Sequence, residues 1–197
     1  MSIAESLIEK HRHINVEHVE WWDSEYECFK QDMAEVGIEV DNIYFSGFWS
    51  QGDGACFEGK IDNLQLFIDK HFKPNQYIAI RKLMEHGGSV YLTVKHRGHY
   101  YHENSTCFSV DCDNFADTLD QPTETHEQVA TALDMALTQD MIDFEAESVA
   151  IFKGYMKKLY RDLERDYDHL TSDKAVKETI EANNLQEIDD GDSQSVL

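Results

Sequence analysis

The feature that most limits the fold is an apolar stripe of helical period in the second half of the chain. From about Thr125 onward, apolar residues return every three or four positions on one face, and no proline interrupts them. The members of this stripe are Val129, Leu133, Leu137, Met141, Phe144, Ile151, Tyr155 and Leu159. Such spacing is typical of an amphipathic α-helix with one buried face. The sequence therefore predicts one long helix, or two helices that meet at a kink near Gly154.

The first half of the chain shows a different pattern, in which runs of β-branched and aromatic residues alternate with turn residues and short helical segments. Such runs are typical of strands. Helices are expected at about 2–13, 16–36, 63–71 and 74–86, and strands at 38–49, 55–61, 89–96 and 99–111. The last two strands would form a hairpin that turns at Arg97-Gly98, with a β-bulge near residues 103–105. A final short helix is expected at 172–182, with Ser172 as its N-cap.

Together these elements predict an α+β fold: a small antiparallel β-sheet with N-terminal helices packed on it and a long acidic helical C-terminal region. No proline- or glycine-rich linker divides the chain, so its length fits one domain with a helical extension. We expect an α+β core domain over residues 1–120, an acidic helical region over 121–182 that packs on the core or extends from it, and a disordered acidic tail over 183–197.

Charge is distributed very unevenly along the chain. The 197 residues include 39 Asp and Glu against 17 Lys and Arg, which gives a net charge of −22. No lysine or arginine occurs between Arg97 and Lys153. That gap contains twelve carboxylates, namely Glu103, Asp111, Asp113, Asp117, Asp120, Glu124, Glu127, Asp134, Asp140, Asp143, Glu145 and Glu147. Like charges at i,i+4 on a helix destabilise it by about 0.2–0.5 kcal/mol per pair, so this surface gives up local stability.

A field this negative repels nucleic acid and anionic membranes and attracts basic proteins. We therefore expect a host protein with a basic groove as the partner, and neither direct nucleic-acid binding nor membrane binding. The expected partner-binding residues are Asp134, Asp140, Asp143, Glu145 and Glu147. Asp140, Asp143 and Glu147 form a helical stripe whose neighbours lie roughly 5–6 Å apart. This stripe is sparser than a DNA strand, which advances about 3.4 Å per phosphate, but its sign and order of spacing are comparable. The alternative is that the acidity serves only solubility.

The densest motif is the glycine-rich segment over residues 45–59, which interleaves glycines with aromatic and polar residues. Its loop residues are Ser50, Gln51, Gly52, Asp53 and Gly54. One interpretation is a binding or catalytic loop that presents Gln51 and Asp53. The other is a tight hairpin in which the Asp53 carboxylate satisfies the loop's own backbone, as in an Asx turn. A phosphate-binding loop is excluded, because the spacing and the terminal Lys-Ser/Thr are absent.

A second polar cluster over residues 95–104 crowds histidines, an arginine and tyrosines into one expected hairpin. With a turn at Arg97-Gly98, His96 would face His99 across the ladder, while His99 and His102 would point to opposite faces. A small hydrolase or nuclease would use Asp53, Arg97, His99 and His102 for acid–base chemistry. The alternative is an ordinary polar sheet edge. No metal site and no cofactor are expected, because the histidines diverge and no metalloprotease motif occurs.

The cysteines and the N-terminal segment bear on the compartment. Cys28, Cys56, Cys107 and Cys112 are scattered without zinc-ligand spacing. The first fifteen residues do not resemble a signal peptide, and no apolar run approaches about 18 residues, the length of a membrane span. We expect a reduced, cytoplasmic protein in which Cys56 is a buried, inert thiol.

The segment Ile43–Gly59, preceded by Trp21-Trp22-Asp23 and followed by Arg97–Glu103, resembles a family of small, uncharacterised phage and prophage proteins. Some members of that family carry an antitoxin label. The resemblance covers roughly residues 15–110. It implies an accessory or counter-defence role in the host cytoplasm and transfers no catalytic residues.

Three hypotheses follow. The first is a non-enzymatic, phage-type inhibitor that acts as an acidic DNA mimic on a host protein with a basic nucleic-acid-binding surface, such as a defence nuclease, a CRISPR effector or a polymerase. The second is a small hydrolase or nuclease whose pocket lies between the Gln51–Asp53 loop and the Arg97–His102 hairpin. The third is an antitoxin-like interaction module. The oligomeric state is left open, with a dimer as one alternative.

Overall fold

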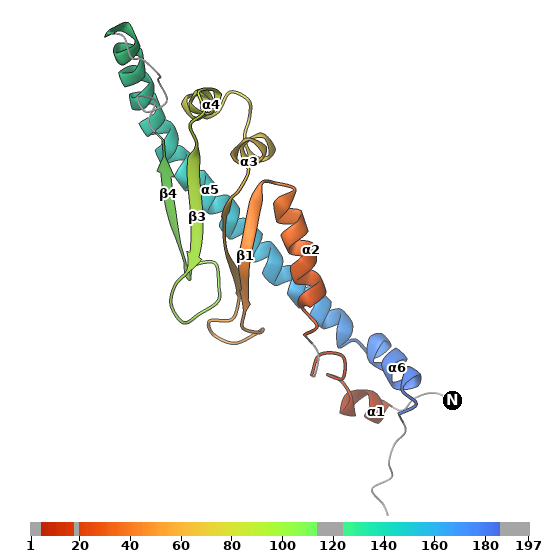
Figure 1. Cartoon of the computed structure of the whole chain (residues 1–197). Helices are drawn as coiled ribbons and strands as arrows, with labels where there is room; N and C mark the ends of the chain where they lie inside the picture. The colour runs from red at the N-terminus through yellow and green to blue at the C-terminus, as the bar shows by residue number, and fades with distance from the viewer. Residues whose placement is uncertain (1–4, 18–19, 114–123, 186–197) are drawn as a thin grey trace, which may run out of the picture. The chain divides into compact units, whose positions relative to one another are not determined.

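The computed structural model describes residues 5–17, 20–113 and 124–185, and the side chains of the last segment from residue 132 onward. Apart from residues 183–185, the tail expected to be disordered lies outside the described residues. The chain divides into two compact units, one formed by Tyr26–Arg161 and the other by Met1–Glu25 together with Asp162–Leu197. The fold class is α+β, as predicted (Figure 1).

The larger unit is built on a four-stranded antiparallel sheet whose strands lie side by side in chain order (Figure 1). Its strands are β1 (Ile38–Phe45), β2 (Ala55–Ile61), β3 (Val90–His96) and β4 (Thr106–Cys112). Side chains alternate between the two faces of such a sheet. Along β3, Val90, Leu92 and Val94 are buried, whereas Tyr91 and Lys95 are exposed. The sheet therefore packs on helices with one face and is polar on the other.

The larger unit contains α3 (Leu64–His71), α4 (Ile78–Glu85), and most of α2 (Asp23–Ala34) and of α5 (Glu124–Leu170). Aromatic rings join them to the buried face of the sheet. Phe57 of β2 contacts Phe29 of α2 at 5.5 Å and Phe152 of α5 at 5.7 Å between ring centroids. The core thus lies between the sheet, α2 and the middle of α5.

The long apolar stripe forms a single helix that continues through Gly154. Leu137, Phe144 and Leu159 of the expected stripe are buried, Leu133 and Met141 are partly buried, and the side chain of Val129 lies outside the described residues. Phe152 and Met156 are fully buried, whereas the expected Ile151 and Tyr155 are only partly buried. The reason is that the buried face advances by steps of four through Ser148, which is 0% exposed. A hydropathy pattern does not select a serine for the core, so counting apolar residues placed the face one position early.

The second hairpin differs from its prediction. His96 pairs with Thr106, so the connection spans residues 97–105 instead of turning at Arg97-Gly98. The expected pairing of His96 with His99 is therefore wrong, and residues 103–105 lie in a loop instead of a bulge. The contacts that hold this loop include a backbone hydrogen bond and a ring contact. Arg97 N–H donates to the Ser105 carbonyl at 2.7 Å, and the Tyr101 ring packs on the Tyr44 ring at 5.4 Å.

The smaller unit contains α1 (Glu5–Lys10), α6 (Asp173–Ala182) and the C-terminal end of α5. Its core is a cluster of aliphatic side chains formed by Leu7, Ile8, Val176 and Ile180, against which Ile14 and Leu185 pack. Ser172 caps α6 as predicted, because its side chain accepts the Ala175 N–H. Arg12 pairs with Asp173 at the start of the same helix.

The ends of several elements fall inside their predicted ranges. The helix expected at 16–36 begins only at Asp23, and the strand expected at 38–49 ends at Phe45. Within the described ranges, the helices are all too short or too polar to cross a membrane.

Candidate functional site

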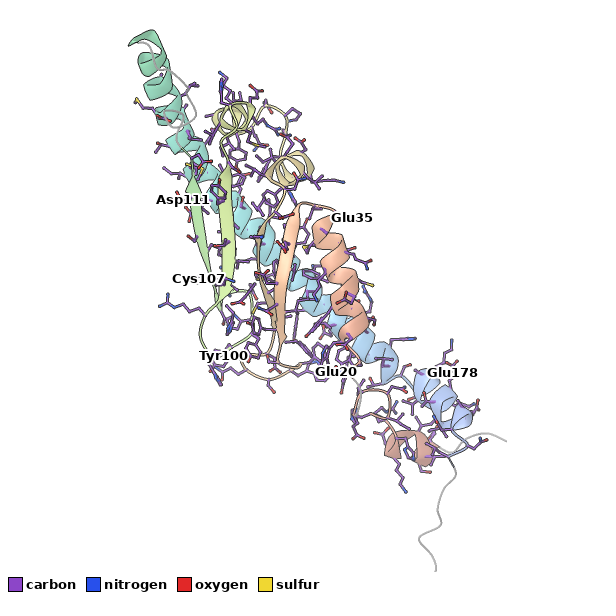
Figure 2. The ribbon with its side chains drawn as sticks, in the orientation of Figure 1. Glu20, Glu35, Tyr100, Cys107, Asp111 and Glu178 are labelled. Atoms are coloured by element: carbon purple, nitrogen blue, oxygen red, sulfur yellow. The ribbon has the colours of Figure 1, made fainter. Side chains whose placement is uncertain are left out.

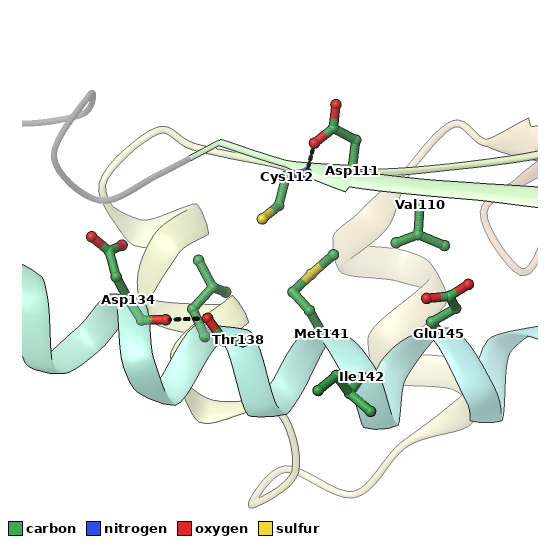
Figure 3. A pocket seen from close by; sticks show the side chains of 9 residues that line it. Val110, Asp111, Cys112, Asp134, Thr138, Met141, Ile142 and Glu145 are labelled. Atoms are coloured by element: carbon green, nitrogen blue, oxygen red, sulfur yellow. Dashed lines mark hydrogen bonds between the residues drawn. The ribbon is translucent and has the colours of Figure 1, made fainter.

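A groove of about 390 Å³ lies between β4 and α5 (Figure 3). We call it the acidic groove. The residues that line it are Val110, Asp111, Cys112, Asp134, Leu137, Thr138, Met141, Ile142 and Glu145. Two of them, Asp134 and Glu145, were expected to bind a partner. The groove therefore brings expected carboxylates together with apolar residues that sequence reasoning did not assign to a site.

Strand alternation and helical period together set the chemistry of the acidic groove. Val110 and Cys112 point from β4 toward α5, and Met141 points from α5 toward β4 (Figure 3). Asp111 points to the other side of the strand, as alternation requires. Ile142 is 59% exposed on the helix. The result is an apolar floor bordered by carboxylates.

Three carboxylates of this part of α5, one of which lines the acidic groove, are exposed and lack a cationic partner among the described residues. Asp143, Glu145 and Glu147 are exposed, and none of the three has an ion pair among the described residues. In contrast, Glu103 pairs with Lys157 at 3.5 Å, where the gap in positive charge has ended. Among the described residues, the cations of the fold therefore leave these three carboxylates unpaired. We call the exposed surface of α5 that carries them its acidic face; Asp143 and Glu147 lie on one side of the helix near Tyr77, and Glu145 lies on the side of the acidic groove.

Asp140 has a different role from its neighbours in the stripe. Its carboxylate accepts the Ala79 N–H at 2.8 Å, in the first turn of α4. Tyr77, at the N-cap position of α4, has φ 55° and supplies no side-chain cap. A carboxylate at a helix N-terminus satisfies a free N–H and interacts favourably with the helix dipole. Asp140 therefore caps α4 from another helix.

Two protonated groups lie beside these carboxylates. The Tyr77 hydroxyl is buried, and its pKa is raised by burial first and then by Glu147, Asp143 and Asp140. Burial also raises the pKa of the Cys112 thiol, with a further contribution from Asp111. A raised pKa keeps a thiol protonated and unreactive. Cys112, the cysteine among the described residues that line the acidic groove, is therefore not an activated nucleophile.

The glycine-rich loop over residues 46–54 joins β1 to β2 and packs against the β3–β4 loop. A Cβ on Gly54 would lie 2.6 Å from the His102 Cβ, and a Cβ on Gly52 would lie 2.2 Å from the Tyr100 ring. Figure 2 shows Tyr100 at the end of the sheet where the two loops meet. The glycines therefore serve close packing. Asp53 accepts the Ser50 N–H at 2.7 Å, so its carboxylate does satisfy the loop's own backbone.

A second pocket, of about 280 Å³, lies beside these loops. We call it the loop pocket. It is lined by Asp53, Gly54, Ala55, His102, Glu103, Met156, Lys157, Tyr160 and Arg161. Asp53 and His102, two of the four proposed catalytic residues, thus share one site. Sequence reasoning missed Lys157, Tyr160 and Arg161, although their spacing on α5 could have indicated a common face.

The other two proposed catalytic residues do not line the loop pocket. Arg97 and His99 are exposed in the β3–β4 loop. The groups that do line it are already engaged locally, because the Asn104 N–H donates to His102 Nδ1 at 3.1 Å. The nearby Cys56 thiol is buried, and burial raises its pKa to about 12. An activated nucleophile with its base therefore does not occur here among the described residues.

Metal binding finds no support in the described residues, where no group of three or more His, Cys, Asp or Glu side chains is arranged to hold an ion. Comparison of the chain with curated proteins and with solved structures finds no match in either. Residues 21–173, which include the whole sheet, both loops and the acidic groove, match a family described as a domain of unknown function. The chain belongs to this family, Domain of unknown function (DUF8835).

Proposed function

We propose that the protein is a non-enzymatic inhibitor that binds a basic, nucleic-acid-binding surface of a host protein through the acidic face of α5. The observation that carries this proposal is the exposure of Asp143, Glu145 and Glu147 without an ion pair among the described residues. Charges left uncompensated within a fold are available to a partner's lysines and arginines. They also accelerate encounter with a positively charged surface.

The class of partner follows from the sign and spacing of these charges. Lysines and arginines that bind the phosphates of a nucleic acid can also bind the carboxylates of an acidic protein surface. Binding there would exclude nucleic acid, so the inhibitor would act by competition. The resemblance to phage proteins supports a counter-defence role in the host cytoplasm, and an antitoxin-like interaction module would use the same surface.

The test is affinity capture from host lysate at low and high salt. A variant of the protein with Asp143→Lys, Glu145→Lys and Glu147→Lys should no longer capture the partner that the wild type captures. A control with Glu17→Lys, Glu20→Lys and Glu35→Lys has the same net charge and should retain it, since these exposed residues lie outside the acidic face. A captured partner should also bind its nucleic acid less tightly when the inhibitor is present. Capture that survives both high salt and the triple reversal on α5 would rule the proposal out.

We retain a small hydrolase or nuclease as the second candidate, because Asp53 and His102 line the same loop pocket. His102 would act as the acid or base and Arg161 would bind an anionic substrate. Turnover of a panel of nucleotides and phosphodiesters would support this function, provided that His102→Ala abolishes it. Absence of turnover throughout the panel would remove the candidate.

A further inference from the structure

The acidic groove has a strand edge as one of its walls. Among the described strands, β4 pairs with β3 alone and lies at the end of the sheet. Figure 2 shows Cys107 and Asp111 along this strand. An edge strand presents backbone N–H and C=O groups that can pair with another extended chain. The groove thus offers backbone hydrogen bonds as well as side chains.

The floor of the groove offers apolar contacts beside that edge. Leu137 is 3% exposed at its base, whereas Ile142, which also lines the groove from α5, is 59% exposed. Val110 of β4 and Met141 of α5 both point into the groove between strand and helix (Figure 3). Exposed aliphatic side chains next to an unpaired edge favour an occupant that buries apolar side chains on one face.

The charged residues that line the groove favour an occupant with positive charge. Asp111 borders it from β4, and Asp134 and Glu145 border it from α5. Among the described residues that line it, none is a lysine or an arginine. A second copy of this chain would bring another Asp111 to the same edge, so like-charge repulsion disfavours pairing of two β4 strands. Charge complementarity therefore indicates a segment that bears lysine or arginine.

We infer that the acidic groove accepts an extended, cationic segment of the partner protein, which adds to β4 as a further strand. The inference rests on the proposed function and specifies how the partner is held. Alternate side chains of the added strand, which are apolar, would enter the groove over Met141 and Ile142, between Asp134 and Glu145. The others, which are cationic, would lie on the opposite face beside Asp111. A helix could meet the same carboxylates but could not use the backbone groups of β4.

The test uses a short fluorescein-labelled peptide of alternating valine and lysine, whose binding to the full chain is followed by fluorescence anisotropy. Asp111→Lys and Ile142→Asp should each weaken binding by about tenfold or more, as expected for contacts at the centre of an interface. Glu35→Lys, the matched charge control, should leave it unchanged. Circular dichroism and urea unfolding establish that each variant is folded. A valine–glutamate peptide should not bind.

Two further measurements separate strand addition from simple attraction between charges. Methylation of the peptide's backbone nitrogens at every second residue removes donors along one edge and keeps every charge, so one of the two methylation patterns should abolish binding. Bound peptide should also slow amide hydrogen exchange in β4.

Equal binding of both methylated peptides, or of a helical leucine–lysine peptide, would overturn the inference, and so would a β4-paired dimer of the chain. If Asp143→Lys and Glu147→Lys weaken partner capture while Asp111→Lys does not, strand addition fails and the proposed function stands.

Discussion

Individual carboxylates of the same helical stripe have different roles, and only contacts distinguish them. Asp140 and Asp143 are three residues apart on α5, yet Asp140 caps α4 through the Ala79 N–H, whereas Asp143 is exposed. We predict that Asp140→Ala lowers the free energy of unfolding by about 1 kcal/mol, the usual effect of losing an N-cap. Asp143→Ala should change it by less than about 0.5 kcal/mol. Urea denaturation measures both, and equal effects would show that Asp140 is not a cap.

Glycines in the loop and in the helix should respond oppositely to alanine. A Cβ at Gly54 would lie 2.6 Å and 2.8 Å from the Cβ and Cα of His102, so Gly54→Ala must displace backbone. We expect it to cost about 1–3 kcal/mol of stability. Gly154 lies in α5 with no atom within 4 Å of an added Cβ. Gly154→Ala should therefore stabilise by up to about 1 kcal/mol. Thermal denaturation of the two variants checks the signs, and tolerance of alanine at Gly54 would contradict the packing role of the loop.

The four cysteines should differ sharply in reactivity. Cys28 and Cys107 are exposed, whereas Cys56 is 0% exposed and burial raises its pKa to about 12. Because the thiolate is the reactive form, Cys56 should resist alkylation until the protein unfolds. Mass spectrometry after brief treatment with iodoacetamide should find label on Cys28 and Cys107 only. Label on Cys56 in the folded protein would show that β2 opens.

At the scale of elements, prediction succeeded where local chemistry decides the structure. The second strand was predicted with its observed ends, Ala55–Ile61, and Ser172 was identified as an N-cap. It failed where distant contacts decide. The alternating pattern of residues 99–105 resembled a strand, but Tyr101 instead packs on Tyr44, far away in sequence, and the ladder begins only at Thr106. Propensity cannot anticipate such a contact.

His71 links α3 to α5 and should make the stability depend on pH. Its Nδ1–H donates to the Phe67 carbonyl at 2.8 Å, and the Tyr155 hydroxyl donates to Nε2 at 2.7 Å. Burial lowers the pKa of His71, so the unfolded chain binds a proton at a higher pH than the folded one. The contribution of neutral His71 is therefore present above the ordinary histidine pKa and is lost as pH falls through the lower, folded pKa.

We predict that His71→Gln reduces the loss of stability between neutral and mildly acidic pH. The comparison is the difference in unfolding free energy between wild type and variant at each pH, because the carboxylates and other histidines are common to both. The unfolding free energy of the wild type should fall toward that of the variant as pH falls. A difference that stays constant over this range would mean that His71 titrates normally in the folded protein.

At the scale of the whole molecule, the sequence indicated the sign of the surface but not its shape. The gap in positive charge predicted an acidic face on α5, and Asp143, Glu145 and Glu147 are exposed there. The acidic groove depends on β4 lying beside α5, which brings Val110 and Asp111 next to Met141 and Glu145. That arrangement follows from sheet order and helix packing, which no local pattern encodes.

The net charge leads to the last prediction, in which two electrostatic effects oppose each other. Salt weakens surface ion pairs, which are worth about 0–1 kcal/mol each, and it also screens the repulsion among like charges. With 39 acidic and 17 basic residues, 22 carboxylates stay uncompensated even if every cation is paired. Repulsion should therefore dominate, and added sodium chloride should raise the midpoint of urea unfolding.

A single charge reversal on the acidic face tests the same balance locally. Glu147→Lys places a cation four residues after Asp143, in the favourable i,i+4 order, and removes a repulsive pair, so it should add a few tenths of a kcal/mol to about 1 kcal/mol at low salt. The gain should shrink as salt rises. A variant that is more stable yet binds its partner less well would indicate that the carboxylate is kept for binding, since stability alone favours its replacement. If salt instead lowers the stability of the wild type, internal ion pairs outweigh the repulsion among carboxylates. The acidic face would then not carry the unpaired charge that the proposed partner binding requires.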